Sequence, residues 1–312
     1  MKACKQFICV FLLASVLSCN NDKSFLLTDN YSSVNDFLNK NGIALRTYTI
    51  DAANGGSFTT AQGTIVTIPS GAFVTQSNLP VTGNVTIQFK DIYKKSDMLL
   101  ADMPAMTSFQ YPLKSGGEFF IKAISNGSAV VLAPGKKIDV TQPASLTGGL
   151  DTINKQAPFV KVQDSTGNGW YPSSDAVSYF SDTYVFDLYQ FHSPVDSGTW
   201  CNSDNASYFF NYNLTNLTLK PNDSASLYGT QVFLVFSKIN CLVHVYNDYY
   251  SSDFRYMYAP GGLQCTLVAL GVRNKVLYSS FVPITITANE SVSFSLSKTT
   301  TDQFKSQLAA LN

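Results

Sequence analysis

The stretch Ser291-Val292-Ser293-Phe294-Ser295-Leu296-Ser297 alternates strictly between serine and large apolar residues. A period of two is typical of a β-strand with one face buried and the other in solvent. Residues 64–68, 84–89 and 136–140 repeat the pattern, and glycine and proline lie between such stretches. The sequence therefore predicts a protein built from half-buried strands.

Two short helices are predicted at the ends of this β-rich region. Ser33 and Asp36 have the spacing of a capping box ahead of an apolar stripe, and Thr300 and Gln303 have the same spacing near the C-terminus. No long helical pattern lies between them, which argues against a parallel βαβ architecture. We therefore expect an all-β fold: two antiparallel β-sandwich domains with a short N-terminal helix and a short C-terminal helix.

The best candidate for a linker is the stretch 143–158, which lacks periodicity and contains Gly148-Gly149. We therefore expect a first β-sandwich domain at residues 31–145 and a second at residues 158–312. A chain of 312 residues is long enough for two separate cores.

The first nineteen residues have the pattern of a secretory signal that ends at a cysteine. Lys2 and Lys5 precede an apolar run at residues 7–16, which is too short to span a bilayer. Val16-Leu17-Ser18-Cys19 follows, and the chain then becomes polar. This pattern predicts export from the cytoplasm.

Cys19 directly after Ser18 resembles the bacterial lipoprotein box, in which the cysteine is acylated and becomes the first residue of the mature chain. The resemblance implies a signal peptide at residues 1–18, a lipidated tether at residues 19–30, and fatty acyl chains such as palmitate on Cys19. The alternative is a plain secreted protein that is cut near Ser18.

The composition fits an extracytoplasmic β protein. The chain has 21 basic and 21 acidic residues, and only 13% of its residues are charged. Nucleic-acid binding requires a basic face that displaces counterions from phosphates, and no such excess is present. We therefore expect no nucleic-acid partner, and membrane attachment through lipid alone because no polybasic patch occurs.

Residues 63–73 carry the most distinctive pattern, Gly-Thr-Ile-Val-Thr-Ile-Pro-Ser-Gly-Ala-Phe. It resembles the opening of the β-sandwich module shared by ankyrins, netrin receptors and tight-junction scaffolds. With residues 81–85, a loop at 97–100 and residues 133–136, it is similar to an uncharacterised family of Gram-negative outer-membrane lipoproteins. Residues 200–204 resemble that family more loosely. The resemblance implies the fold and a bacterial outer-membrane location, and it supplies no catalytic residues.

No catalytic or cofactor motif is present. The sequence lacks a Gly-x-Ser-x-Gly elbow, paired zinc ligands and a phosphate-binding glycine loop, and it has only two histidines, His192 and His244. Phe191-His192-Ser193 is similar to the His-Phe-Ser self-cleavage step of some relatives of the module, but its order differs. We therefore expect no enzyme, no metal and no cofactor.

Aspartates supply the remaining catalytic alternative. Asp182 and Asp187 are five residues apart, as are Asp248 and Asp253, and neither spacing matches a calcium loop. We interpret them as solvated residues of loops and strand ends. An aspartate-based hydrolase is the alternative.

Three cysteines remain beyond Cys19, namely Cys201, Cys241 and Cys265. In an oxidising compartment, a disulfide between two of them is one alternative. The other is three buried thiols that pack as small hydrophobes. The sequence does not choose between them.

The second domain has many aromatic residues around Arg255. Exposed rings stack on sugars, so a glycan-binding surface is one hypothesis. Its members would be Tyr246, Tyr249, Tyr250, Tyr256 and Tyr258. The alternative, which we favour, is that alternate aromatic residues face the core.

The leading expectation is a lipid-anchored cell-envelope protein with a non-enzymatic binding or scaffolding role. Its expected partners are the membrane, through the lipid, and an envelope protein or a glycan. A glycan-binding lipoprotein is the second hypothesis, and the aspartate-based hydrolase is the third.

Overall fold

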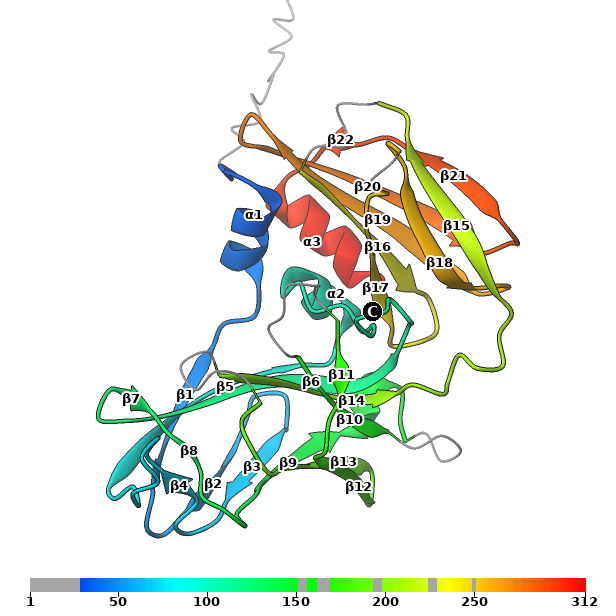
Figure 1. The fold of residues 1–312 in the computed structure, drawn as a ribbon. Coiled ribbons are helices and arrows are strands. Elements are labelled where there is room, and N and C mark those ends of the chain that lie inside the picture. The colour runs from blue at the N-terminus through cyan, green and yellow to red at the C-terminus, as the bar shows by residue number, and fades with distance from the viewer. Residues whose placement is uncertain (1–28, 151–155, 162–168, 193–197, 224–228, 249–250) are drawn as a thin grey trace, which may run out of the picture.

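The computed structural model describes residues 29–150, 156–161, 169–192, 198–223, 229–248 and 251–312. These residues form two β-sandwiches, with three short helices packed where the sandwiches meet (Figure 1). The arrangement confirms the predicted all-β fold with a short helix near each end.

The first sandwich contains two sheets that face each other across an apolar core. We call one the junction sheet, because its outer face meets the helices. Its strand order is β1 (Arg46–Asp51), β5 (Asn84–Ile92), β6 (Lys114–Ser125), β14 (Thr199–Asn205), β10 (Ala157–Val160) and β11 (Tyr171–Pro172), with β7 (Ser128–Ala129) beside β6.

The other sheet of this sandwich is the far sheet. Its strand order is β12 (Ala176–Phe180), β13 (Thr183–Leu188), β9 (Ile138–Pro143), β3 (Ile65–Ile68) and β2 (Gly56–Thr59). A separate pair consists of β4 (Phe73–Val74) and β8 (Val131–Leu132), and the 3-10 helix η1 (Ala144–Thr147) follows β9.

The second sandwich also has two sheets. The helix-covered sheet has the order β17 (Leu242–Val245), β16 (Thr230–Phe236), β19 (Gln264–Arg273), β20 (Val276–Thr285) and β22 (Ser297–Lys298). The three-stranded sheet has the order β18 (Phe254–Pro260), β15 (Leu214–Pro221) and β21 (Glu290–Phe294). Named strands pair antiparallel throughout the described ranges, except that β15 and β21 are parallel.

The alternating stretch at residues 291–297 forms parts of two strands instead of one. β21 pairs with β15 in one sheet, and β22 pairs with β20 in the other, so the chain changes sheets after Phe294. Val292, Phe294 and Leu296 nevertheless all pack on the core of the second sandwich. The period of the sequence therefore predicts the buried face and does not reveal the break in the strand.

Three helices line the place where the sandwiches meet: α1 (Val34–Asn41), α2 (Lys95–Leu100) and α3 (Thr301–Ala309). α1 and α3 begin at their predicted caps. Ser33 Oγ accepts a hydrogen bond from the Asp36 N–H, and Thr300 and Gln303 form a complete capping box. α2 falls where the sequence predicts a loop, because six residues are too few to show a helical period.

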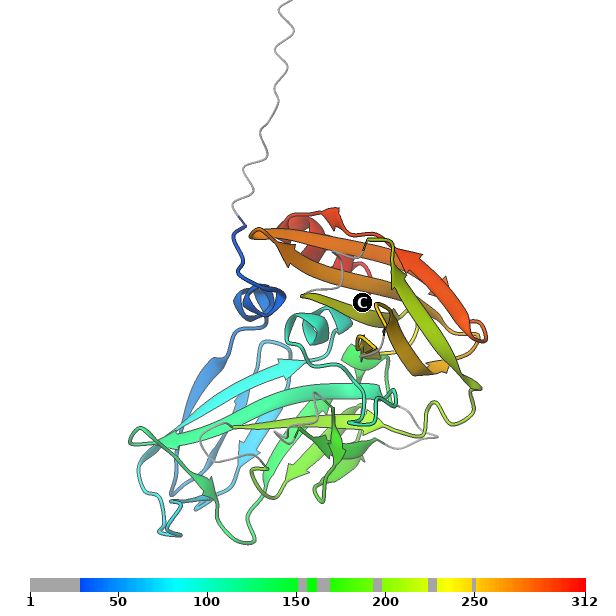
Figure 2. The ribbon, with the colours of Figure 1, turned by 45° about the horizontal axis from the view of Figure 1, so that its top comes forward.

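The helices and the two sandwiches share one apolar cluster, which we call the junction. Phe37 of α1 and Phe304 of α3 have ring centroids 5.5 Å apart. Both pack with Phe233 of the helix-covered sheet, and Ile92 of the junction sheet belongs to the same cluster. Figure 2 shows α2 lying between the two sandwiches.

The predicted boundary between residues 145 and 158 does not divide the sheets and needs correction. β13 pairs with β9, and β14 pairs with β6, so the strands from residue 157 to residue 205 complete the first sandwich. α1, assigned by sequence to the first domain, packs in the junction against the second sandwich. Gly148, with a φ of 95°, ends η1 in a turn, and such a glycine turn looks like a linker in sequence.

Candidate functional sites

Two acidic side chains lie buried on the outer face of the junction sheet. The register places Glu118 of β6 between Ile92 of β5 and Asn202 of β14. Phe119 points into the core of the first sandwich, so Glu118 points toward the junction. Asp204 follows on β14 after a bulge, and its Oδ2 accepts a hydrogen bond from Asn202 Nδ2 at 2.8 Å. Both acids are 0% exposed.

Burial shifts the pKa of both acids. It raises the pKa of Glu118 and of Asp204 well above that of an ordinary carboxyl group. The charge of Asp204 raises the pKa of Glu118 further, while Lys161 opposes this shift. Neither carboxyl oxygen of Glu118 has a hydrogen-bond partner in the part of the chain that the structure describes. Burial disfavours the ionised form of both acids and closes them off from a substrate, so we assign them to the packing between the two sandwiches.

His244 of β17 is buried next to the same region. Its ring stacks 4.7 Å from the ring of Phe233 and 4.5 Å from that of Tyr246. Burial lowers the pKa of His244 to about 4; Asp102 opposes this shift and Lys161 adds to it. The imidazole is therefore neutral at pH 7. Across the described ranges, no three His, Cys, Asp or Glu side chains come together to hold a metal ion.

The residue types of a serine hydrolase meet at one place in the first sandwich, and the sequence spacing did not indicate it. His192 Nε2 lies 2.5 Å from Asp175 Oδ2 and 3.3 Å from Ser173 Oγ. Ser173 Oγ also donates to Asp175 Oδ2 at 2.6 Å. In a catalytic triad, the acid binds Nδ1 and leaves Nε2 for the serine. Here Asp175 binds Nε2 itself, so the cluster lacks a free base for Ser173 and serves to connect its loops.

The aspartates of the hydrolase alternative lie in two different sandwiches. Asp187 Oδ1 is 3.0 Å from Lys137 Nζ in the first, and Asp248 Oδ2 is 3.2 Å from Arg255 Nε in the second. Asp182 is exposed in the turn between β12 and β13. These residues are not gathered into one site.

Cys201, Cys241 and Cys265 are free, buried thiols. Cys201 packs in the core of the first sandwich, and the other two pack in the core of the second. Burial raises the pKa of Cys265 to about 12 and that of the other two well above the ordinary value. The structure thus has the packed-thiol alternative, and the disulfide alternative is not formed among these three residues.

The tyrosines of the predicted glycan surface do not share one exposed face. Residues alternate along β18, so that Tyr256 is 0% exposed and Met257 is 60% exposed. The prediction that Tyr256 contacts a glycan is therefore wrong, because the strand period turns its ring inward. Tyr246 is half-buried, and Tyr249 and Tyr250 lie outside the described residues.

Tyr258 instead lies beside a small aromatic surface formed by loops. Its ring centroid is 5.9 Å from that of Tyr111, which is 5.9 Å from that of Phe210. Phe210 is 69% exposed, and Phe109, two residues before Tyr111, is 80% exposed. Exposed apolar groups that gather in this way often mark contact surfaces. No local pattern in the sequence indicates this surface, because its loops are distant along the chain.

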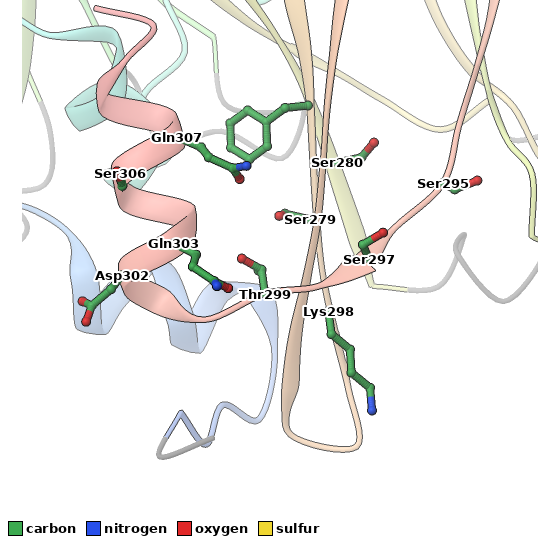
Figure 3. Close-up of a pocket in the computed structure, with 11 residues that line it drawn as sticks. Ser279, Ser280, Ser295, Ser297, Lys298, Thr299, Asp302, Gln303, Ser306 and Gln307 are labelled. Carbon is green, nitrogen blue, oxygen red and sulfur yellow. The ribbon is translucent and has the colours of Figure 1, made fainter. Parts of the chain in front are cut away.

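A groove of about 780 Å³ opens between α3 and the edge of the helix-covered sheet at β20 and β22 (Figure 3). Hydroxyl and amide side chains dominate its lining, and Phe281 supplies a single ring. Ser279 and Thr299 point from the strands toward α3, while Gln303 and Gln307 reach from α3 toward the strands (Figure 3). The residues come from a serine-rich strand and a polar helix face, neither of which is distinctive in sequence.

A comparison with protein-family models and with curated proteins finds no match for the chain. The predicted signal peptide and the predicted lipidation site, Cys19, lie outside the described residues. Among the helices that the structure describes, none has the length and apolar character needed to cross a membrane.

Proposed function

We propose that the protein is a lipid-anchored protein of the bacterial outer membrane with a non-enzymatic binding or scaffolding role. The signal pattern that ends at Cys19 and the similarity to outer-membrane lipoproteins support this location. Acyl chains on Cys19 would attach the chain to the membrane. The two sandwiches would then present their surfaces to a partner in the cell envelope.

The observation that carries this proposal is that hydrogen bonds attach the end of the predicted tether, and the residue after it, to the body of the protein. Asp29 Oδ2 accepts a hydrogen bond from the Thr301 N–H at 2.6 Å, and Tyr31 OH lies 2.6 Å from Thr301 Oγ1. The segment from Cys19 to Asp29 spans at most about 35 Å when it is fully extended. A lipid on Cys19 would therefore hold the whole body close to the membrane.

The state of the polar clusters supports a role without catalysis. Glu118 and Asp204 are 0% exposed, so neither carboxyl group reaches a substrate as an acid or a base. The serine of the Ser173 cluster has no free base nitrogen beside it. Accessible surfaces, in contrast, lie at the groove beside α3 and at the loops around Phe210, and they would be available to a partner.

Replacing Cys19 with alanine tests the anchor. We expect the wild-type protein in the membrane fraction, and Cys19→Ala in the soluble fraction with its β-sheet spectrum retained. Cys9→Ala is the matched control, because Cys9 belongs to the predicted signal peptide and its loss should leave lipidation unchanged. Cys19→Ala protein that remains in the membrane at the wild-type level would contradict the proposal.

A further inference from the structure

We propose that the groove between α3 and β20 binds a neutral oligosaccharide, an inference that rests on the proposed role as an envelope binding protein. This site is separate from the tyrosine surface that the sequence predicts. Its volume of about 780 Å³ lies within the range of ordinary ligand pockets. The choice of ligand class follows from the chemistry of the lining.

The polar groups of the groove are available to a ligand. Ser279, Ser280, Ser297 and Gln307 have no side-chain hydrogen bond to any other residue within the described ranges. A serine hydroxyl both donates and accepts, and a glutamine amide offers two donors and an acceptor oxygen. Sugar hydroxyls also donate and accept, so this lining matches a polyhydroxylated ligand better than an apolar one.

Phe281 supplies the flat surface that sugar binding requires. It is half-buried, and its ring centroid lies 5.6 Å from that of Phe304, a buried residue of α3. This contact supports the ring in place, so that its accessible part can meet the C–H face of a sugar. A single ring among many hydroxyl groups is too little for a lipid chain.

The charges of the groove favour a neutral ligand. Lys298 and Asp302 both line it, both are exposed, and their formal charges cancel. A phosphorylated or sulfated ligand would require an excess of positive charge, as P-loops and arginine clusters provide. The lining shows no such excess.

An extended peptide is the main competing occupant, because part of a sheet edge lies in the groove. β22 pairs with β20 only at Tyr278 and Ser279, and β20 continues to Thr285. Peptides add to such edges through backbone hydrogen bonds. Pro283 lies in the uncovered part and has no N–H to donate, which disfavours an added strand. The observations therefore favour the glycan.

The groove also lies at the tethered end of the body. Thr301, which bonds to Asp29, sits between two residues of the lining, Thr299 and Asp302. A ligand in the groove would therefore lie near the point where the tether joins the body. Glycans at a membrane surface are within reach of such a site.

Calorimetric titration of the full mature protein, in a detergent without sugar groups, tests the proposal. The probes are tetraacetylchitotetraose, maltotetraose and cellotetraose, with a pentaserine peptide as the competing class. We expect at least one saccharide to bind. The double variant Ser279→Ala/Gln307→Ala should weaken that binding about tenfold, because it removes two ligand hydrogen bonds from side chains that face each other across the groove (Figure 3). Phe281→Leu keeps an apolar contact with Phe304, and it should weaken binding at least about fivefold because the flat ring is lost.

Two matched variants serve as controls. Gln264→Ala removes an exposed glutamine at the start of β19, and Phe210→Leu removes an exposed ring outside the groove; both should leave the affinity unchanged. Absence of saccharide binding, binding of the peptide alone, or a loss confined to Phe210→Leu would overturn the proposal. Release of Cys19→Ala from membranes is measured separately, so failure of the glycan site and failure of the anchor are distinguishable.

Discussion

The polar side chains beside the junction and those in the groove differ in their access to solvent. Beside the junction, Glu118 and Asp204 are 0% exposed and His244 is 8% exposed; burial raises the pKa of both acids and lowers that of His244 to about 4, so it disfavours the charged form of each. In the groove, Ser280 and Gln307 remain accessible and carry no titratable group. A strongly shifted pKa therefore marks packing in this protein, and it would mark a functional site only where the group also reaches a ligand.

A cavity in the junction should have the largest effect on stability. Phe233 is 0% exposed and packs among the helices, so Phe233→Ala should lower the free energy of unfolding by about 3–5 kcal/mol through the cavity that it leaves. Urea denaturation followed by tryptophan fluorescence measures this loss. Phe109→Ala removes a ring that is 80% exposed and should change stability by less than about 0.5 kcal/mol. Equal losses in the two variants would show that the junction is not a sealed core.

The second-largest effect is a loss of stability at low pH that arises from His244. Its folded pKa of about 4 lies below the ordinary value of 6.5, so the unfolded chain takes up the proton first as the pH falls. The stability from the neutral ring is fully present above pH 6.5 and is lost between pH 6.5 and about 4, a change of about 3 kcal/mol. His244→Phe should reduce the difference in the free energy of unfolding between pH 7 and pH 4.5, measured by urea denaturation. An unchanged difference would mean that the ring is not buried.

Glu118 should act with the opposite sign, and its effect over the single pH unit from 5 to 6 should be smaller than that of His244 over its whole range. Its folded pKa is raised, so the unfolded chain loses the proton first as the pH rises. The stability from the protonated acid is fully present below about pH 4.3 and declines above it by about 1.4 kcal/mol per pH unit, until the folded pKa is reached. Glu118→Gln cannot ionise, so its free energy of unfolding should rise relative to that of the wild type between pH 5 and 6. Urea denaturation at both pH values measures the difference.

The other glutamate of the chain, Glu290, offers the matched control. It is half-buried at the start of β21, where its Oε2 accepts a hydrogen bond from the Thr287 N–H. Glu290→Gln makes the same chemical change at this half-buried position, and its stability at pH 5 and 6 is the reference for Glu118→Gln. If the two variants respond alike, the acid beside the junction is not buried as described.

Which face of a strand is buried follows from the sequence, and the partner of a strand does not. Val292 and Phe294 face the core as their alternation predicts, and the same period explains why Tyr256 is buried. In contrast, β14 pairs with β6 across a long stretch of chain, and no local pattern indicates that partner. The domain boundary was therefore misplaced although the strands were anticipated.

The candidate sites were harder to predict because tertiary packing creates them. Glu118 follows two glycines in a strand and looks solvated in sequence; only the helices and the second sandwich bury it. Ser279 and Gln307 form one groove because the C-terminal helix docks beside β20. The N-caps of α1 and α3 were predictable, since their signals lie within four residues.

The contact between α1 and α3 joins the first and last helices of the body. During synthesis, residues 34–41 leave the ribosome long before residues 301–309 exist, so Phe37 cannot yet contact Phe304. Until then, its apolar stripe is a natural target for a chaperone that escorts nascent chains. Premature termination only a dozen residues from the end would remove Phe304 and leave part of that stripe uncovered.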